Sequence, residues 1–148
     1  MNIRAMKIED VPGVMIVELE SFTVPWSADA FEHEIRNNPF AYYFVLEQEG
    51  MICGYAGMWL IIDEAHVTNI AVSQAYRGQK WGEKLLNQLI ELAEKNGAIR
   101  MTLEVRVSNF VAQKMYAKYG FTYQTTRPRY YSDNSEDAWV LTREGSNG

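Results

Sequence analysis

The sequence predicts a mixed α/β fold, in which a central mixed sheet of about seven strands is flanked on both faces by about four helices. Two kinds of apolar segment indicate this. Some are rich in β-branched and aromatic residues, and others carry apolar residues at a period of about 3.6. Several strand-like segments follow one another through short turns, whereas others are separated by a helix-like segment, as in β-α-β crossovers. A chain of 148 residues has the length of one such domain, residues 1–148.

The first part of the chain is expected to form one strand and two helices. Residues 2–8 form the strand, and Asp10, followed closely by Pro12, is the expected N-cap of the first helix. Ser27 begins the second helix. This helix ends before Pro39, because the residue that precedes a proline disfavours helical geometry.

The rest of the chain is expected to contain six more strands and two more helices. The strands are bounded by turn residues and are expected at residues 41–48, 51–62, 65–73, 99–107, 121–131 and 137–143. One helix runs from Trp81 to Lys95 with its apolar residues on one face, and a shorter one begins at Ser108-Asn109. The expected order of elements is therefore β-α-α-β-β-β-α-β-α-β-β.

Composition and charge argue against several classes of protein. With 47% hydrophobic and 22% charged residues the chain can bury a core, and no apolar segment reaches the ~18 residues that a membrane-spanning helix needs. A net charge of -5 argues against a nucleic-acid partner, which needs a basic face on the protein. The single cysteine, Cys53, allows no internal disulfide and fits a reducing, cytoplasmic setting. Because the sequence has only two histidines in addition to this cysteine, no metal site is expected.

A glycine-containing loop lies between the expected strand 65–73 and the helix that follows it. The loop reads Arg77-Gly78-Gln79-Lys80-Trp81-Gly82. A helix N-terminus has unpaired N–H groups and a positive dipole end, and Arg77 and Lys80 add charge, so a phosphate or pyrophosphate is the favoured ligand. The spacing does not fit a Walker A loop, and an ordinary solvated turn is the alternative interpretation.

The stretch NIAVSQAYRGQKWGEKLL, residues 69–86, resembles motif A of the GCN5-related N-acetyltransferases, the GNAT family. Lys80 replaces the middle glycine of the family's loop, so a lysine must adopt the loop's backbone conformation without glycine's freedom. The resemblance implies acetyl-CoA as co-substrate, with its pyrophosphate on the loop's backbone amides and its pantetheine arm along Ile70 to Val72. The cofactor-binding residues that it implies are Ile70, Ala71, Val72, Arg77, Gly78, Gln79, Lys80, Trp81, Gly82 and Asn109. For Asn109 a plain helix N-cap is the alternative.

A narrower resemblance involves five segments in order. They read VPWS, NIAV, LEVRVSN, MYAKYGF and RYYSDNSEDAWVL, and are similar to those of the GNAT enzymes that acetylate protein N-termini, including ribosomal-protein N-alpha-acetyltransferases. This resemblance implies direct transfer of an acetyl group from acetyl-CoA to a protein N-terminus. The implied partner is a small-subunit ribosomal protein with an N-terminal alanine.

The same resemblance implies the catalytic residues. Glu104 stands in an apolar strand, where a carboxylate lies either in a cleft or on a solvated edge, and is the implied proton acceptor for the amine. Tyr116, on the short helix, is the implied proton donor to the leaving thiolate, and a core tyrosine is the alternative. His66 is either a second base or a structural residue near the start of its strand.

Aromatic residues are implied for the acceptor site. Trp26, between the first two helices, and Tyr130 with Tyr131, before an acidic turn, would form two walls around the substrate. Such walls would admit an unblocked N-terminus and exclude a long lysine stem, although aromatic residues in these places are also typical of core packing.

Other functions are compatible with the same scaffold, because acceptor loops differ among proteins that share a fold. The acceptor could be a lysine side chain or a small-molecule amine. The chain could also be an acyl-CoA-binding module without catalysis, a reading that Lys80 in place of glycine keeps open.

Overall fold

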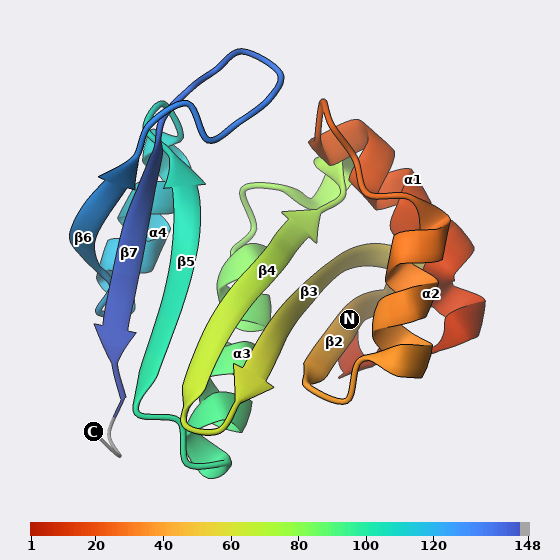
Figure 1. The fold of residues 1–148 in the computed structure, drawn as a ribbon. Helices are drawn as coiled ribbons and strands as arrows, with labels where there is room; N and C mark the ends of the chain where they lie inside the picture. Colours follow the sequence, from red (N-terminus) through yellow and green to blue (C-terminus); the bar gives the residue numbers. More distant parts are fainter. Residues whose placement is uncertain (146–148) are drawn as a thin grey trace.

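The computed structural model describes residues 1–145 as a twisted mixed sheet with helices on both faces (Figure 1). The strands are β1 (Asn2–Ala5), β2 (Ala41–Gln48), β3 (Met51–Ile61), β4 (Glu64–Val72), β5 (Arg100–Arg106), β6 (Thr122–Arg127) and β7 (Ala138–Glu144). The helices are α1 (Val11–Ser21), α2 (Ala28–Asn37), α3 (Trp81–Lys95) and α4 (Phe110–Lys118), with two short 3-10 helices, η1 (Ile8–Asp10) and η2 (Gln74–Tyr76). Over residues 1–145, the seven strands and four α-helices follow the predicted order.

The strand order in the sheet is β1-β2-β3-β4-β5-β7-β6. Neighbouring strands are antiparallel except β4 and β5, which are parallel because α3 connects them as a crossover. Their pairing is short and runs only from Glu64 opposite Arg100 to His66 opposite Thr102. Beyond His66 the two strands diverge, as Figure 1 shows, and the sheet divides into two halves.

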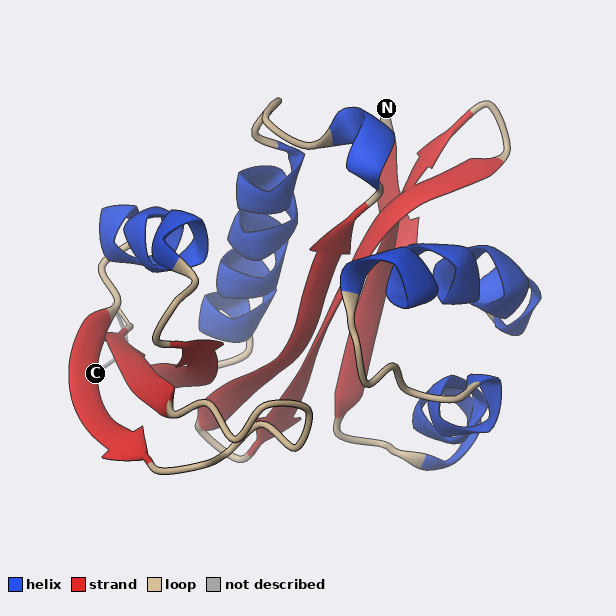
Figure 2. Cartoon of the chain, turned by 90° about the horizontal axis from the view of Figure 1, so that it is seen from above, coloured by secondary structure: helices blue, strands red, loops and turns tan. Residues whose placement is uncertain are grey.

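The two faces of the sheet are covered by different helices (Figures 1 and 2). Helices α1 and α2 pack over β2, β3 and β4 on one face, and α3 packs on β3 and β4 from the other. Strand β3 is therefore buried on both faces: Tyr55 belongs to the core under α1 and α2, whereas Ala56 and Met58 belong to the core under α3 and α4. Within residues 1–145, every helix is too short or too polar to cross a lipid bilayer.

Asp10 and Ser27 are the N-cap residues of α1 and α2, as predicted, but only the Ser27 side chain makes a capping hydrogen bond. The Ser27 hydroxyl accepts a hydrogen bond from the Ala30 N–H at 3.1 Å, as an N-cap does. Asp10 does not cap α1 with its side chain, because its carboxylate accepts the Lys7 N–H at 2.8 Å within η1. The same carboxylate pairs with Arg4 at 2.7 Å, and the guanidinium lowers the pKa of Asp10. The predicted first strand is accordingly shorter and ends at Ala5.

Candidate active site

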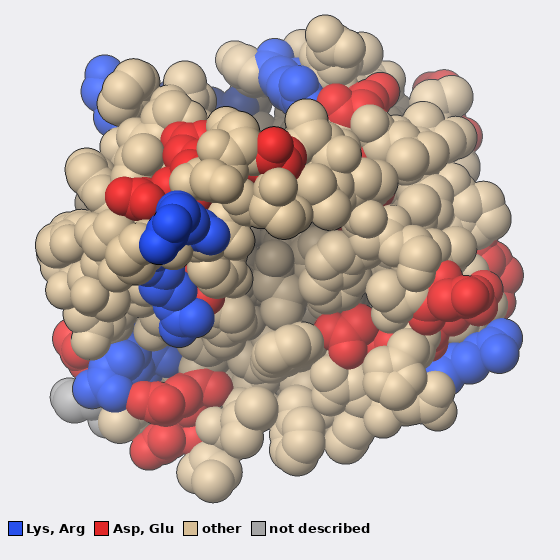
Figure 3. All heavy atoms as spheres, turned by 45° about the horizontal axis from the view of Figure 1, so that its top comes forward, with Lys and Arg blue, Asp and Glu red and all other residues tan. Residues whose placement is uncertain are grey.

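A cavity of about 390 Å³ opens where β4 and β5 diverge. Figure 3 shows a hollow near the centre of this face of the molecule, with charged side chains around it. Residues from α1, the α1–α2 loop, β4, β5, α4 and the β6–β7 loop line the cavity. Eight of the residues singled out from the sequence are among them: Trp26, His66, Ile70, Glu104, Asn109, Tyr116, Tyr130 and Tyr131.

A β-bulge in β4 marks the point of divergence. Gly57 of β3 pairs with Asn69, but the next residue, Met58, pairs with Val67, so Thr68 is the extra residue. A bulge bends its strand and increases the local twist. Within the described residues, β4 has no ladder partner on its β5 side beyond His66, so its remaining backbone groups on that side face the cavity.

Glu104 of β5 and His66 of β4 meet across the cleft. The His66 Nε2 lies 2.7 Å from the Glu104 Oε2, although the two residues are 38 positions apart in the chain. The Glu104 side chain is 10% exposed and that of His66 is 38% exposed, so the carboxylate lies inside the cavity and the imidazole at its edge. Burial and the nearby Glu104 carboxylate raise the pKa of Tyr130, which places that phenol close to Glu104.

Tyr116 is the one buried residue of α4, at 9% exposure, and it borders the same cavity. Its ring packs edge-on against Phe121 with the centroids 5.6 Å apart. Within residues 1–145 its hydroxyl has no hydrogen-bond partner, and burial raises the pKa of Tyr116. The phenol is therefore protonated at neutral pH and available to a group inside the cavity.

Asn109 has a structural role whatever else it does. Its side-chain oxygen accepts the Ala112 N–H at 3.1 Å and caps α4. This contact is the N-cap that the sequence predicted as the alternative, and Asn109 also borders the cavity.

Two loops form opposite sides of the cavity. The α1–α2 loop contributes Trp26, whose ring lies 5.3 Å from that of Phe31. The β6–β7 loop contributes Tyr130 and Tyr131, whose rings meet edge to face at 5.1 Å. Burial raises the pKa of Tyr131 to about 12. The predicted strand 121–131 ends earlier, at Arg127, which leaves both tyrosines in the loop.

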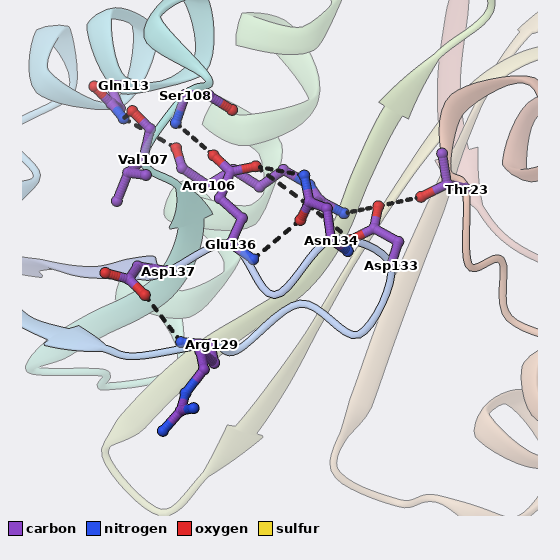
Figure 4. Close-up of polar contacts among 10 residues, drawn as sticks. All are labelled: Thr23, Arg106, Val107, Ser108, Gln113, Arg129, Asp133, Asn134, Glu136 and Asp137. Carbon is purple, nitrogen blue, oxygen red and sulfur yellow. Dashed lines mark hydrogen bonds and ion pairs between the residues drawn. The ribbon is translucent and has the colours of Figure 1, made fainter.

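Arg106 of β5 holds the β6–β7 loop in place (Figure 4). Its guanidinium donates to both oxygens of Asp133, at 2.8 and 3.1 Å, and lies over the Tyr131 ring at 3.9 Å. Glu136 of the same loop accepts the Ser108 N–H at 2.8 Å. Thr23 of the α1–α2 loop donates a hydrogen bond to Asp133, so the two loops meet across the mouth of the cavity.

A second cavity, of about 500 Å³, lies between the 77–82 loop and α4. Six of the predicted cofactor residues line it: Val72, Arg77, Gly78, Lys80, Trp81 and Gly82. Lys114 and Lys118 of α4 add two cations that the sequence did not single out as site residues. Arg77 is held by the protein itself, because it donates to the Val72 carbonyl at 2.9 Å and to the Ser21 hydroxyl at 3.0 Å.

Two predicted cofactor residues, Ala71 and Gln79, line neither of these two cavities. Ala71 is buried in the core under α1 and α2 because its side chain points to the opposite face of β4 from Ile70 and Val72. Gln79 is exposed in the loop. For Ala71, only the backbone groups can therefore contact a ligand in these cavities.

Lys80 adopts a backbone conformation that favours glycine. Its φ and ψ are 67° and 18°, the left-handed region, at the N-cap of α3. Gly78, two residues earlier, also has a positive φ of 79°. A left-handed non-glycine residue stores on the order of 1 kcal/mol of strain, so this loop keeps its shape at a cost in stability.

Comparison with known proteins agrees with this geometry. Residues 12–121 match the acetyltransferase (GNAT) family. Over 145 residues, 96% of both chains, the protein is 46% identical to one from Bacillus subtilis (strain 168) that is provisionally named a ribosomal protein bS18-alanine N-acetyltransferase. It is 35% identical over 143 residues, 95% of both chains, to the ribosomal protein bS18-alanine N-acetyltransferase of Escherichia coli (strain K12). The crystal structure of the ribosomal-protein-S18-alanine N-acetyltransferase from Escherichia coli superimposes with a TM-score of 0.90 at 33% identity, covering 99% of this chain and 96% of that one. The chain therefore belongs to the GNAT family of acetyltransferases.

Proposed function

We propose that the protein transfers an acetyl group from acetyl-CoA to the N-terminal amine of a protein. The proposed target is the N-terminal alanine of the small-subunit ribosomal protein bS18, the substrate given in the names of its relatives. The observation that carries the proposal is that Glu104 and Tyr116 border one cavity, from two different elements, between two aromatic-lined loops. A proton acceptor and a proton donor in one cleft are what transfer from a thioester to an amine requires.

Acetyl-CoA fits the two cavities along β4. Ile70 borders the first cavity and Val72 the second, so a pantetheine arm along this stretch would connect them. The free backbone edge of β4 offers it hydrogen bonds, and the N-terminus of α3 offers N–H groups to the pyrophosphate. Lys80 and Lys114 supply positive charge for the phosphates, whereas the Lys118 ammonium pairs at 2.9 Å with Glu83, which borders the same cavity.

In this arrangement Glu104 accepts a proton from the ammonium, directly or through a water, and leaves a neutral amine. The amine nitrogen attacks the thioester carbon, a C–N bond forms and the C–S bond breaks. Backbone N–H groups of β4 stabilise the oxyanion, and Tyr116 gives its proton to the departing thiolate. After the C–N bond forms, the nitrogen loses its second proton to solvent and becomes the amide nitrogen. The proton that Glu104 has taken also returns to solvent, and Tyr116 regains one from solvent, so the net reaction releases one proton. No acetylated residue of the protein is formed.

His66 is proposed to orient Glu104, because its Nε2 lies 2.7 Å from one carboxylate oxygen. His66→Ala should lower kcat by about tenfold through loss of this hydrogen bond, with little change in the KM for acetyl-CoA. His66→Gln keeps an N–H donor on a side chain of similar reach and should recover part of the rate. Equal losses in both variants would contradict the role.

Lys80→Gly separates the strain of the loop from its charge. Because Lys80 has a φ of 67°, glycine should raise the free energy of unfolding by about 1 kcal/mol while weakening acetyl-CoA binding severalfold. Lys80→Asn is the matched control, since asparagine tolerates this conformation but carries no charge. Thermal unfolding and calorimetry with acetyl-CoA measure the two effects. Tighter binding by both variants would exclude a phosphate contact for Lys80.

Two matched basic peptides test the proposed function. One carries a free N-terminal alanine, and the other has this terminus blocked but keeps an internal lysine. With acetyl-CoA, only the first should be acetylated at a substantial rate. Acetylation of only the second would make the protein a lysine acetyltransferase. Failure of both, with acetyl-CoA binding intact, would point to a small-molecule acceptor or to a binding module.

A further inference from the structure

Glu18 is a buried carboxylate that the proposed reaction does not use. It lies in the last turns of α1, is 1% exposed and borders the cavity. Its neighbours on the same helix, Val14 and Val17, are core residues. Burying a carboxylate is costly unless its oxygens are hydrogen-bonded, and burial raises the pKa of Glu18. The partners of the two oxygens therefore indicate what this side chain does.

Both carboxylate oxygens of Glu18 accept a hydrogen bond. One of the two donors is Trp26, which forms one wall of the proposed site for the acceptor amine (the acceptor wall). The Trp26 N–H donates to Oε2 at 2.9 Å, and the Tyr55 hydroxyl donates to Oε1. Trp26 stands in the irregular segment between α1 and α2, where the backbone has no helix or strand ladder to hold it. A side chain of α1 thus anchors the backbone at the residue whose ring borders the cavity.

Tyr55 extends this anchor to the strand at the other side of the cavity. It is fully buried in β3, where it pairs with Ala71 of β4. Asn69 lies in β4 beside the bulge, is buried, and borders the cavity. Buried polar contacts therefore run from Trp26 through Glu18 to Tyr55 of β3, the strand that pairs with β4.

We propose that Glu18 is a positioning residue for the acceptor, which fixes the backbone of Trp26 relative to β4. The acceptor amine must approach the acetyl group within a narrow range of distance and direction, and small displacements lose much of the rate. A buried network in which every polar group is hydrogen-bonded holds such a wall in a single arrangement. This inference rests on the proposed function, because the acceptor wall is defined by it.

Glu18→Gln is the informative variant. Glutamine keeps the shape of the side chain but has a single acceptor oxygen, so the two present contacts cannot both persist: either the Trp26 N–H loses its partner, or the Tyr55 hydroxyl must reverse and accept from the amide. If Glu18→Gln folds poorly, Tyr55→Phe is the second variant, because it removes the hydrogen bond between the Tyr55 hydroxyl and Glu18.

Glu34→Gln is the matched control. Glu34 is also a buried carboxylate, at 6% exposure, and lies in α2. It accepts the Tyr43 hydroxyl at 2.9 Å and the Trp59 Nε1–H at 2.5 Å, and it does not border the cavity. Its substitution should lower thermal stability without changing the conformation of the α1–α2 loop.

Two readouts decide the inference. The KM for the alanine peptide should rise by about tenfold in Glu18→Gln, as expected for one lost buried hydrogen bond, while the KM for acetyl-CoA stays within about twofold. Hydrogen–deuterium exchange at the Trp26 amide should accelerate by a similar factor. Glu34→Gln should change neither.

The outcomes separate this inference from the proposed function. An unchanged peptide KM, or equal increases in both KM values, would overturn the positioning role. So would an unchanged exchange rate at Trp26, which is measured without any acceptor. If the wild-type protein acetylates neither peptide, the proposed function fails, and the exchange measurement still decides whether Glu18 anchors Trp26.

Discussion

Glu104→Gln is expected to lower kcat by about 10²–10³-fold, because the variant keeps the shape of the side chain but cannot accept a proton from the amine. The carboxylate borders the cavity between β4 and β5 and does not line the cavity proposed for the phosphates. The KM for acetyl-CoA should therefore change by no more than about twofold. Steady-state kinetics with the alanine peptide, together with calorimetry for acetyl-CoA, measure both values.

Glu64→Gln provides the control for a carboxylate on the same sheet. Glu64 pairs with Arg100 at 2.6 Å at the start of β4, is 58% exposed and does not border the cavity. An exposed pair contributes little to stability, and its loss should leave kcat unchanged. If Glu104→Gln retains the wild-type rate, Glu104 is not the proton acceptor.

Tyr116→Phe is expected to lower kcat by about a hundredfold and to leave stability unchanged or slightly raised. The rate should fall because the thiolate loses its proton donor. Stability should not fall, because the Tyr116 hydroxyl has no hydrogen-bond partner within residues 1–145 and phenylalanine fills the same space against Phe121. Thermal unfolding and steady-state kinetics on the same preparations separate the two effects. A loss of both stability and rate would indicate a structural tyrosine.

The pH dependence of the wild-type rate tests the same residue. A proton donor acts in its neutral form, and burial raises the pKa of Tyr116 above its usual value of about 10. The protonated form therefore persists to higher pH, and kcat should show no decrease between pH 7 and about 10 that depends on this phenol. A decrease in that range that disappears in Tyr116→Phe would show that this phenol titrates there, and would contradict the raised pKa rather than the donor role.

Much of the fold follows from local patterns. Helix α3 spans Trp81–Lys95 as predicted, because apolar residues at helical spacing specify one buried face over four turns. The two outermost strands are shorter than predicted. Strand β1 ends where its pairing with β2 ends, and β6 ends at Arg127, where its pairing with β7 ends. These limits depend on the partner strand, which local composition does not describe.

The candidate site depends more on contacts between distant residues. The apolar strand around Glu104 left open whether its carboxylate lies in a cleft or on a solvated edge, and its contact with His66 requires the parallel register of β4 and β5. Glu18 gave no signal, because its partners Trp26 and Tyr55 are brought to it only by tertiary packing. Arg106 was visible as part of a motif, but its role in holding Asp133 depends on a loop 27 residues away.

The central claim is that the protein transfers the acetyl group directly to an alpha-amine. A single-turnover reaction with acetyl-CoA and the alanine peptide, followed by mass spectrometry of both protein and peptide, tests it most directly. We predict that the acetyl group appears on the N-terminal nitrogen of the peptide and that the protein never gains the mass of an acetyl group. An acetyl group on a lysine of the peptide, or a transient one on the protein, would contradict the account.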